Sequence, residues 1–302
     1  MALATDPVPD TTATRAPARA GRGASDPRTL ASRFVGYAVL IFFSLVFLYP
    51  FVIQIANAVK SEADAAADPL SPIPHPFTGD SIARIFSGTG FPTWLGNSIL
   101  VTVVVTLSRV LFDSMAGYAL SRLRFRGRRP LFAMLLAMMA VPPVVLLIPK
   151  FLVLNQLGMY NSYPALIVPL MVDAAGVFIM KQFFDSVPAS VEEAARIDGA
   201  GTFRTFWSVV LPTAKPALIT LTILSFQGSW NEFPSTLVAV QDPALFTLPR
   251  GLADLVSGSL GAGTQYPLKL GAALLATIPV AIIFVVFQRY FVRDANEGAD
   301  KG

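Results

Sequence analysis

The chain has 302 residues, of which 54% are hydrophobic and 14% are charged, and its formal net charge at pH 7 is +4. This balance is unlike that of a soluble domain and is typical of an integral membrane protein. Because the chain contains no cysteine, disulfides, thiol nucleophiles and cysteine metal sites are excluded. The single histidine, His75, lies in a proline-rich stretch, so we expect it to be solvated and expect no metal site.

Residues 1–33 are rich in Ala, Pro, Thr and Arg and show no apolar periodicity, which predicts a disordered tail. Residues 34–56 follow without a charged side chain, and a helix needs ~20 such residues to cross a bilayer. A signal peptide is the rival interpretation, since basic residues precede this stretch and Ala63-Asp64-Ala65 follows it. Because the apolar cores of signal peptides contain only ~7–15 residues, a retained span is favoured.

Further long apolar segments follow the first one. Between the first two segments, residues 60–93 contain many prolines and both signs of charge, which predicts an exposed loop with a short helix near 82–86. The fold class we predict is an all-α integral membrane protein, with six transmembrane helices between residues 34 and 292 and a short cytoplasmic tail at 293–302. The predicted spans are Phe34–Ala56, Leu95–Leu120, Leu131–Leu152, Ser162–Met180, Ala217–Val240 and Leu270–Phe287.

The positions of lysine and arginine predict the orientation of these spans. If the N-terminus lies inside, the inside segments carry seventeen of these residues and the outside segments carry five, while Arg109 lies within a span. Such residues favour cytoplasmic loops, so we expect a multi-pass protein of the cell membrane with both termini in the cytoplasm. The same bias explains the arginine clusters without nucleic-acid binding, and it places the hydrophilic stretch 186–216 in the cytoplasm.

This hydrophilic stretch is expected to form two short helices joined by a tight turn. Ser190 and Glu193 have the spacing of a capping box at the start of the first helix. Glu192 and Arg196 are four residues apart, in the favourable order for an ion pair. Gly199 is expected to stop the first helix, because glycine tolerates the left-handed conformation at a helix C-terminus.

The second short helix is expected to carry an apolar stripe on one face and to end at Pro212. Taken alone, such a hairpin is also consistent with an amphipathic surface helix that caps a membrane domain. The residues of the stripe are Phe203, Phe206, Trp207 and Val210.

The spacing of Glu193-Ala194-Ala195, Gly199 and Leu211-Pro212 closely resembles the EAA loop of the membrane subunits of ATP-binding-cassette importers. The residues around it, above all Ala-Arg-Ile-Asp-Gly-Ala at 195–200, resemble the carbohydrate-uptake branch of that family. The chain looks like the shorter, maltose-type permease subunit. Other segments that resemble the family are 97–98, 117–127, 248–252, 288–292 and 298–302.

The resemblance implies a permease domain over 34–292, in which 186–216 is a coupling loop that sits in a groove of a cytoplasmic ATPase. It implies a second homologous permease subunit, two cytoplasmic ATPase subunits and an extracytoplasmic sugar-binding protein as partners, in a lipid membrane. The chain has no G-x-x-x-x-G-K-[ST] phosphate loop, so ATP and Mg are expected on the ATPase and no cofactor on this chain. The implied coupling residues are Glu192, Glu193, Ala194, Ala195, Arg196, Asp198, Gly199, Leu211 and Pro212.

Three charged residues are expected inside the membrane, where charge is costly and usually faces protein or water. Arg109 and Asp113 are four residues apart on the second span. They suit either a mutually neutralising pair against a neighbouring helix or a part of the permeation pathway. Asp173 lies beside small residues in the fourth span and suits a bond to a partner subunit or a place in the pathway.

The fifth span carries the polar sequence Gln227-Gly-Ser-Trp-Asn-Glu232 before Pro234. Gln227, Trp230, Asn231 and Pro234 have the spacing of one helix face. Amide and carboxylate groups bind sugar hydroxyls and an aromatic ring packs on the sugar, so Gln227, Trp230, Asn231 and Glu232 are candidate substrate-pathway residues. The alternative is that these residues hold helices together.

The function that fits these features is a permease subunit of an ATP-driven importer that moves a sugar or oligosaccharide by alternating access. The same architecture could serve another solute, such as polyamine or phosphate. An ion-coupled secondary transporter that uses the three intramembrane charges is the rival of a different class, and the chain shows no clear inverted repeat to favour it. No nucleophile–base pair points to an enzyme. The resemblance also suggests that residues 257–265 reach towards the binding protein.

Overall fold

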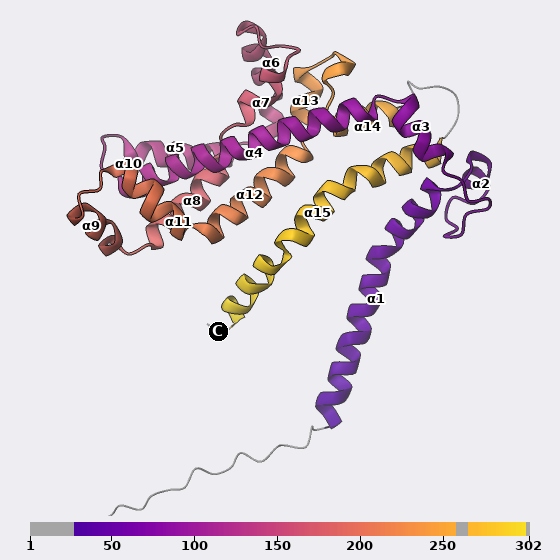
Figure 1. Ribbon diagram of the computed structural model, residues 1–302, viewed down its shortest axis with the longest axis horizontal. Helices are drawn as coiled ribbons and strands as arrows, with labels where there is room; N and C mark the ends of the chain where they lie inside the picture. Colours follow the sequence, from indigo (N-terminus) through magenta and orange to yellow (C-terminus); the bar gives the residue numbers. More distant parts are fainter. Residues whose placement is uncertain (1–26, 258–264, 300–302) are drawn as a thin grey trace, which may run out of the picture. The chain divides into compact units, whose positions relative to one another are not determined.

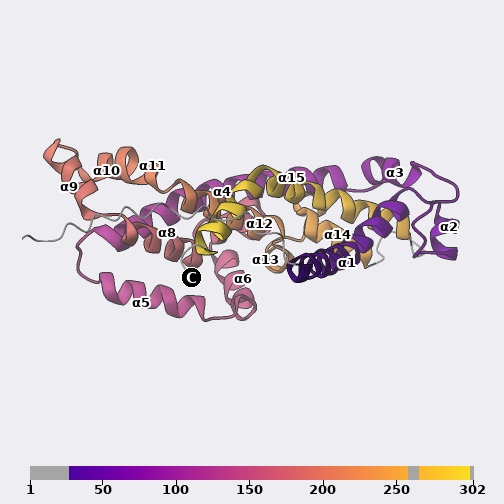
Figure 2. The same ribbon diagram turned by 90° about the horizontal axis from the view of Figure 1, so that it is seen from below.

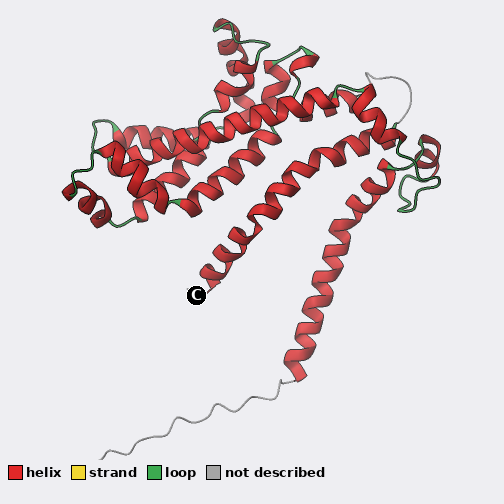
Figure 3. Ribbon diagram, viewed as in Figure 1, coloured by secondary structure: helices red, strands yellow, loops and turns green. Residues whose placement is uncertain are grey.

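The computed structural model describes residues 27–257 and 265–299, with side chains described over 32–257 and 265–288. Every named secondary-structure element in these ranges is a helix, and loops join the helices (Figure 3). The predicted all-α class is therefore confirmed for the described residues. A single isolated bridge, between Lys60 and Phe77, is the only β-type pairing recorded among them.

The chain divides into two compact units, residues 1–50 and 51–302. Helix α1 (Pro27–Ala58) begins in the first unit and continues across the boundary. Its side chains from 32 to 50 are exposed, which suits an apolar helix surrounded by lipid. The predicted disordered tail, 1–33, is wrong for 27–33, which are helical; residues 1–26 lie outside the described residues.

The second unit contains the remaining helices, which Figure 1 colours in chain order. Several are short, because breaks divide the predicted third, fourth and fifth spans. The helices are α2 (Glu62–Ala67), α3 (Asp80–Gly88), α4 (Phe91–Arg122), α5 (Arg128–Met139), η1 (Pro143–Leu146), α6 (Leu147–Gln156), α7 (Tyr163–Ile167), η2 (Val168–Leu170), α8 (Ala174–Ser186), α9 (Ala189–Ile197), α10 (Thr202–Thr205), η3 (Phe206–Val210), α11 (Leu211–Thr213), α12 (Lys215–Trp230), α13 (Pro234–Ala239), η4 (Pro243–Leu245), α14 (Leu248–Val256) and α15 (Tyr266–Ala299).

Four helical stretches in the described residues are long and apolar enough to cross a membrane, and two bent helix pairs raise the number to six. The larger number equals the six predicted spans, although the second bent pair joins Thr202–Thr213 to Lys215–Trp230, whereas the predicted fifth span is 217–240. The fifth predicted span is α12 followed by α13, with a break at 231–233. The last helix continues to Ala299, so residues 293–299 of the predicted tail extend α15.

The breaks in the spans have local causes. The third span bends by 101° between α5 and η1, where Pro142 and Pro143 remove two backbone donors. The fifth span breaks before Pro234, which begins α13. The break at 171–173, between η2 and α8, follows Pro169 and is held by side chains of α4, as described below.

The core of the second unit is built around α4, which packs against α8 and α12. The α4–α8 contact is so close that a Cβ added at Gly176 would lie 2.2 Å from Asp113 Oδ2. Figures 1 and 2 both place α9, α10 and α11 at one end of this bundle and α3 and α14 at the other. A cluster of buried aromatic and apolar residues supports the α9 end and includes Tyr118, Met180, Phe184, Phe206, Val210 and Leu221.

The loops at the α14 end are more ordered than the sequence indicates. The predicted helix near 82–86 is confirmed as α3, but the loop of 60–93 is not uniformly exposed, because Lys60 is fully buried. Its Nζ donates to the carbonyls of Asp68 and Ser71 at 2.7 and 2.9 Å, which satisfies the buried charge. His75 is exposed, as expected.

A second ordered loop is fixed to α4 by Asn97. Its Nδ2 donates to the carbonyls of Ala244 and Phe246 at 2.8 and 2.9 Å, and the neighbouring Ser98 Oγ accepts the N–H of Leu248 at 2.7 Å. The resemblance singled out Asn97-Ser98, and the structure gives these residues a local role. Of the stretch 257–265, residues 258–264 lie outside the described residues.

Candidate functional site

The polar hairpin forms two short helices joined by a turn, but its first helix starts in a different register from the one predicted. Helix α9 begins at Ala189 with Pro188 as its N-cap, and no side chain caps it. Ser190 is therefore already the second helical residue, two positions after the N-cap. The predicted capping box of Ser190 and Glu193 is wrong for this reason.

The end of α9 is as predicted. Gly199 has φ of +77°, a left-handed conformation that favours glycine. The N–H of Ala200 donates to the carbonyl of Ala195 at 2.9 Å, and the N–H of Gly199 donates to that of Arg196 at 3.0 Å. These two bonds are the pair found in a Schellman motif, so the turn that aims α9 is fixed by its backbone.

The second helix of the hairpin continues through Pro212 to Thr213 instead of ending there. A π-helical turn, η3, precedes the proline and accommodates its missing N–H. The predicted apolar stripe divides into two pairs. Phe206 and Val210 are buried against the bundle, whereas Phe203 and Trp207 are exposed.

Glu192 lies on the inner face of α9 and is 5% exposed. Its Oε1 is 3.1 Å from Arg122 Nε, although the N–H does not point along this line as in a hydrogen bond. Its Oε2 accepts a long bond of 3.4 Å from Tyr118 Oη and lies 3.9 Å from Arg196. The predicted pairing of Glu192 with Arg196 is therefore present, but the stronger, buried ion pair is with Arg122.

Arg122 is the last residue of α4 and was missed as a site residue by the sequence analysis. Its Nη2 donates to the carbonyls of Phe184 and Val187, at the end of α8. A single guanidinium thus joins α4, the end of α8 and α9. The motif at 117–127 contains both Tyr118 and Arg122, and that resemblance was the only signal in the sequence for their role.

The outer face of α9 is exposed. Glu193, Ala194, Arg196 and Asp198 are exposed. Ala195, one of the implied coupling residues, is 7% exposed and packs inward. Leu211 is half-buried and Pro212 is exposed. A polar cleft of about 550 Å³ separates α9 from the loop after α4, and its lining includes Arg122, Arg124, Arg128 and Arg196.

The intramembrane charges hold the broken fourth span together. Arg109 Nε donates to the carbonyl of Leu170 at 2.7 Å, and Asp113 Oδ1 accepts the N–H of Asp173 at 3.0 Å. No ion pair within 4 Å joins Arg109 to Asp113 among the described residues, so the predicted neutralising pair is wrong. Asp173 caps α8 by accepting the N–H of Gly176 at 3.1 Å.

The four candidate substrate-pathway residues do not share one environment. Trp230 is 4% exposed, stacks on Phe226 and donates its Nε1–H to the carbonyl of Ala276 at 3.1 Å. This residue therefore packs α12 against α15, and together with Asn231 it lines a cavity of about 640 Å³. Glu232 accepts the N–H of Ser235 at 2.8 Å and so supports the first turn of α13.

Gln227 and Asn231 are the two members of this group that are exposed. Asn231 Nδ2 donates to the backbone carbonyl of Gln227 at 2.9 Å, where α12 ends.

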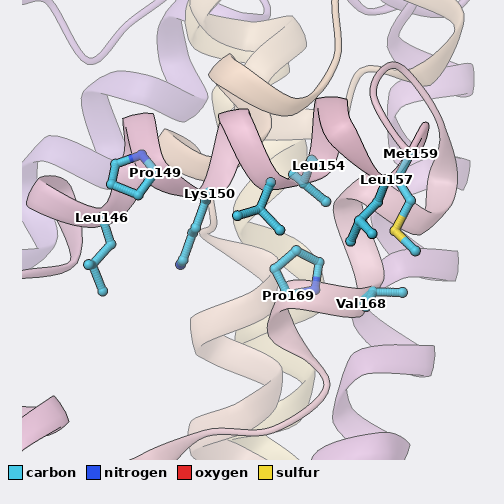
Figure 4. Close-up of a pocket in the computed structure, with 9 residues that line it drawn as sticks. Leu146, Pro149, Lys150, Leu154, Leu157, Met159, Val168 and Pro169 are labelled. Carbon is cyan, nitrogen blue, oxygen red and sulfur yellow. The ribbon is translucent and has the colours of Figure 1, made fainter.

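A cavity of about 340 Å³ lies between η1–α6 and η2, and its lining side chains are drawn in Figure 4. Apart from Lys150, the lining is apolar, with residues such as Leu154, Leu157 and Pro169. Such a lining offers no set of donors and acceptors for a sugar. Among the described residues no cluster of His, Asp or Glu could hold a metal ion.

Comparisons with known proteins identify the family. Residues 110–296 match the family described as the binding-protein-dependent transport system inner membrane component. The chain is 32% identical to the arabinooligosaccharides transport system permease protein AraQ of Halalkalibacterium halodurans, over 89% of this chain and 95% of that one. It is 31% identical to the sn-glycerol-3-phosphate transport system permease protein UgpE of Yersinia enterocolitica, over 85% and 93%.

A solved structure shares the fold. The crystal structure of a bacterial ABC transporter involved in the import of the acidic polysaccharide alginate has a chain with a TM-score of 0.77 and 27% identity, covering 89% of this chain and 99% of that one. The sequence and structural matches extend over most of the chain, and the family match includes the polar hairpin. The chain therefore belongs to the inner membrane components of binding-protein-dependent transport systems, and it is a multi-pass transport permease.

Proposed function

We propose that this chain is a permease subunit of an ATP-driven importer of a sugar or oligosaccharide. The substrate class is supported by the relatives, which include permeases named for arabinooligosaccharides and for sulfoquinovosyl glycerol. The observation that carries the mechanism is the hairpin. Its α9 exposes Glu193 and Ala194 on one face while the opposite face, with Glu192, is anchored to the end of α4.

The partner of this exposed face is a cytoplasmic ATPase that binds ATP and Mg. The chain itself lacks a phosphate loop, so the energy for transport must come from another subunit. Two ATPases, a second homologous permease subunit and an extracytoplasmic binding protein complete the transporter. Closure of the ATPases moves α9, and this movement exposes a central cavity alternately to the two sides of the membrane.

The orientation that this mechanism requires agrees with the charges on the chain. Five arginines lie between residues 122 and 129, at the same end of the bundle as α9. An excess of lysine and arginine favours the cytoplasmic side. Both termini and α9 then lie in the cytoplasm, and α3 and α14 lie outside.

Gln227 and Asn231 are the side chains of this subunit that contact the solute. Both are exposed beside the break between α12 and α13. Irregular backbone at membrane depth is tolerated where it lines a cavity or is covered by protein. Their amides supply donors and acceptors for sugar hydroxyls. Trp230 instead packs α12 against α15.

The test is uptake by proteoliposomes that contain the complete transporter, with a panel of labelled arabino-oligosaccharides, other sugars, sn-glycerol 3-phosphate, a polyamine and phosphate. We expect uptake of a sugar that requires ATP and the binding protein and that survives collapse of ion gradients. Uptake by this chain alone, driven by an ion gradient, would contradict the proposal.

A further inference from the structure

Arg122 occupies a position where three segments of the chain meet. It ends α4, donates to the two carbonyls that end α8, and forms an ion pair with Glu192 of α9. The side chains of Arg122 and Glu192 are 14% and 6% exposed. A carboxylate at this depth requires a charged partner, because an unpaired buried charge is strongly destabilising.

The ion pair joins Arg122 and Glu192, which are far apart in the sequence and close in space. Helix α9 packs mainly on α10 and η3, which belong to the same hairpin. Only Val187 and Pro188 separate α8 from α9 along the chain. The ion pair and the bond from Tyr118 to Glu192 therefore connect the hairpin directly to the end of α4.

Helix α4 leads from this point into the middle of the membrane domain without a break. Arg109 and Asp113 lie on the same helix and hold the broken fourth span at Leu170 and Asp173. Arg109 is about 20 Å from Arg122 along the helix axis, at ~1.5 Å per residue. A displacement of α9 is thus transmitted along the continuous helix α4, which is bonded to the broken fourth span.

We propose that Arg122 is a positioning residue through which α9 moves α4, so that Arg122 and Glu192 couple the ATPase to the solute pathway. The chemistry suits arginine, since its planar guanidinium carries its charge next to the Glu192 carboxylate while Nη2 donates to two carbonyls. Lysine would keep the charge but lose this fork. This proposal rests on the proposed function and adds a route for the force.

The experiment uses the complete transporter in proteoliposomes and measures solute transported per ATP hydrolysed. This ratio does not change when a fraction of the protein is inactive, because inactive copies contribute to neither quantity. The variants are Arg122→Gln, Glu192→Gln and the double variant, with Arg126→Gln as the control. Arg126 is an exposed arginine of the loop that follows α4 and does not line the cleft beside α9.

We expect each single variant to reduce the ratio by at least about fivefold, the lower end of typical coupling between two sites. Because the two residues act as one pair, the double variant should be no worse than either single one. Arg126→Gln should match the wild type. An unchanged ratio in Arg122→Gln, or single effects that multiply in the double variant, would overturn the proposal.

Two further outcomes are decisive. If Arg122→Gln does not assemble, Arg122→Lys provides the same test with the buried charge retained; loss of assembly in both would show a structural role alone and overturn the proposal. If the wild type itself shows no ATP-driven uptake, the proposed function fails, and the coupling role of Arg122 fails with it. If the wild type and Arg122→Gln transport the same amount of solute per ATP hydrolysed, the proposed function stands and this inference is overturned.

Discussion

Gly176 is the position where a single added carbon tests the packing of the membrane domain. In Gly176→Ala the new Cβ would lie 2.2 Å from Asp113 Oδ2 and 2.9 Å from Leu221 Cδ1. The carboxylate would have to retreat by about 1 Å to restore a normal contact. It is fully buried, and its other oxygen holds the N–H of Asp173, so it cannot move freely.

The expected cost combines overpacking, ~1–3 kcal/mol, with weakening of a hydrogen bond to a charged group, ~1.5–3 kcal/mol. We take a net destabilisation of about 3 kcal/mol, which lowers Tm by roughly 6 °C at ~2 °C per kcal/mol for a chain of this size. The assay is thermal unfolding of the purified chain in detergent, followed by tryptophan fluorescence at one scan rate.

Gly96→Ala is the matched control, because Gly96 lies inside α4 and no atom is near its added Cβ. It should stabilise the helix by ~0.5–1 kcal/mol. In an Asp113→Ala background the cost of Gly176→Ala should shrink, since the clashing oxygen is gone. A Tm for Gly176→Ala equal to that of the wild type would refute the close α4–α8 packing described above.

Three further predictions concern the hairpin, an ordered loop and the solute pathway. Gly199→Val should strain the left-handed turn by ~1–2 kcal/mol or more and reduce ATP-coupled uptake, whereas Gly201→Ala should not, because φ there is −71°; equal uptake rates in the two variants would argue against the turn. Asn97→Ala removes donors to two carbonyls and should lower Tm, at ~0.5–1.5 kcal/mol per bond, and an unchanged Tm would contradict this. Gln227→Ala should raise KM for the sugar with ATP coupling intact, while Trp230→Phe should lower Tm and leave KM unchanged; the reverse pattern would exchange their roles.

The spans could be predicted from the sequence because crossing a membrane imposes length and apolarity on each segment. The turn at Gly199 could also be predicted, since a left-handed residue at a helix end favours glycine strongly. Both are local properties, readable within a few residues or along one continuous segment.

The remaining features depend on contacts between residues that are distant in sequence. The spacing of Arg109 and Asp113 suggested a pair, but each is used to satisfy a backbone group of the broken fourth span. Glu192 paired with Arg196 in the sequence interpretation, yet its buried partner, Arg122, comes from another helix. The start of α9 was misplaced by two residues because Pro188, and not Ser190, stands at its N-cap.

Glu193→Cys offers the most direct measurement of the central claim, because the natural chain contains no cysteine and the label would be unique. Glu193 is exposed on α9, so a membrane-impermeant maleimide should reach it in inside-out vesicles and not in intact cells. Bound ATPase subunits should protect it from the reagent. Labelling in intact cells, or equal labelling with and without the ATPases, would contradict a cytoplasmic α9 that couples ATP hydrolysis to transport.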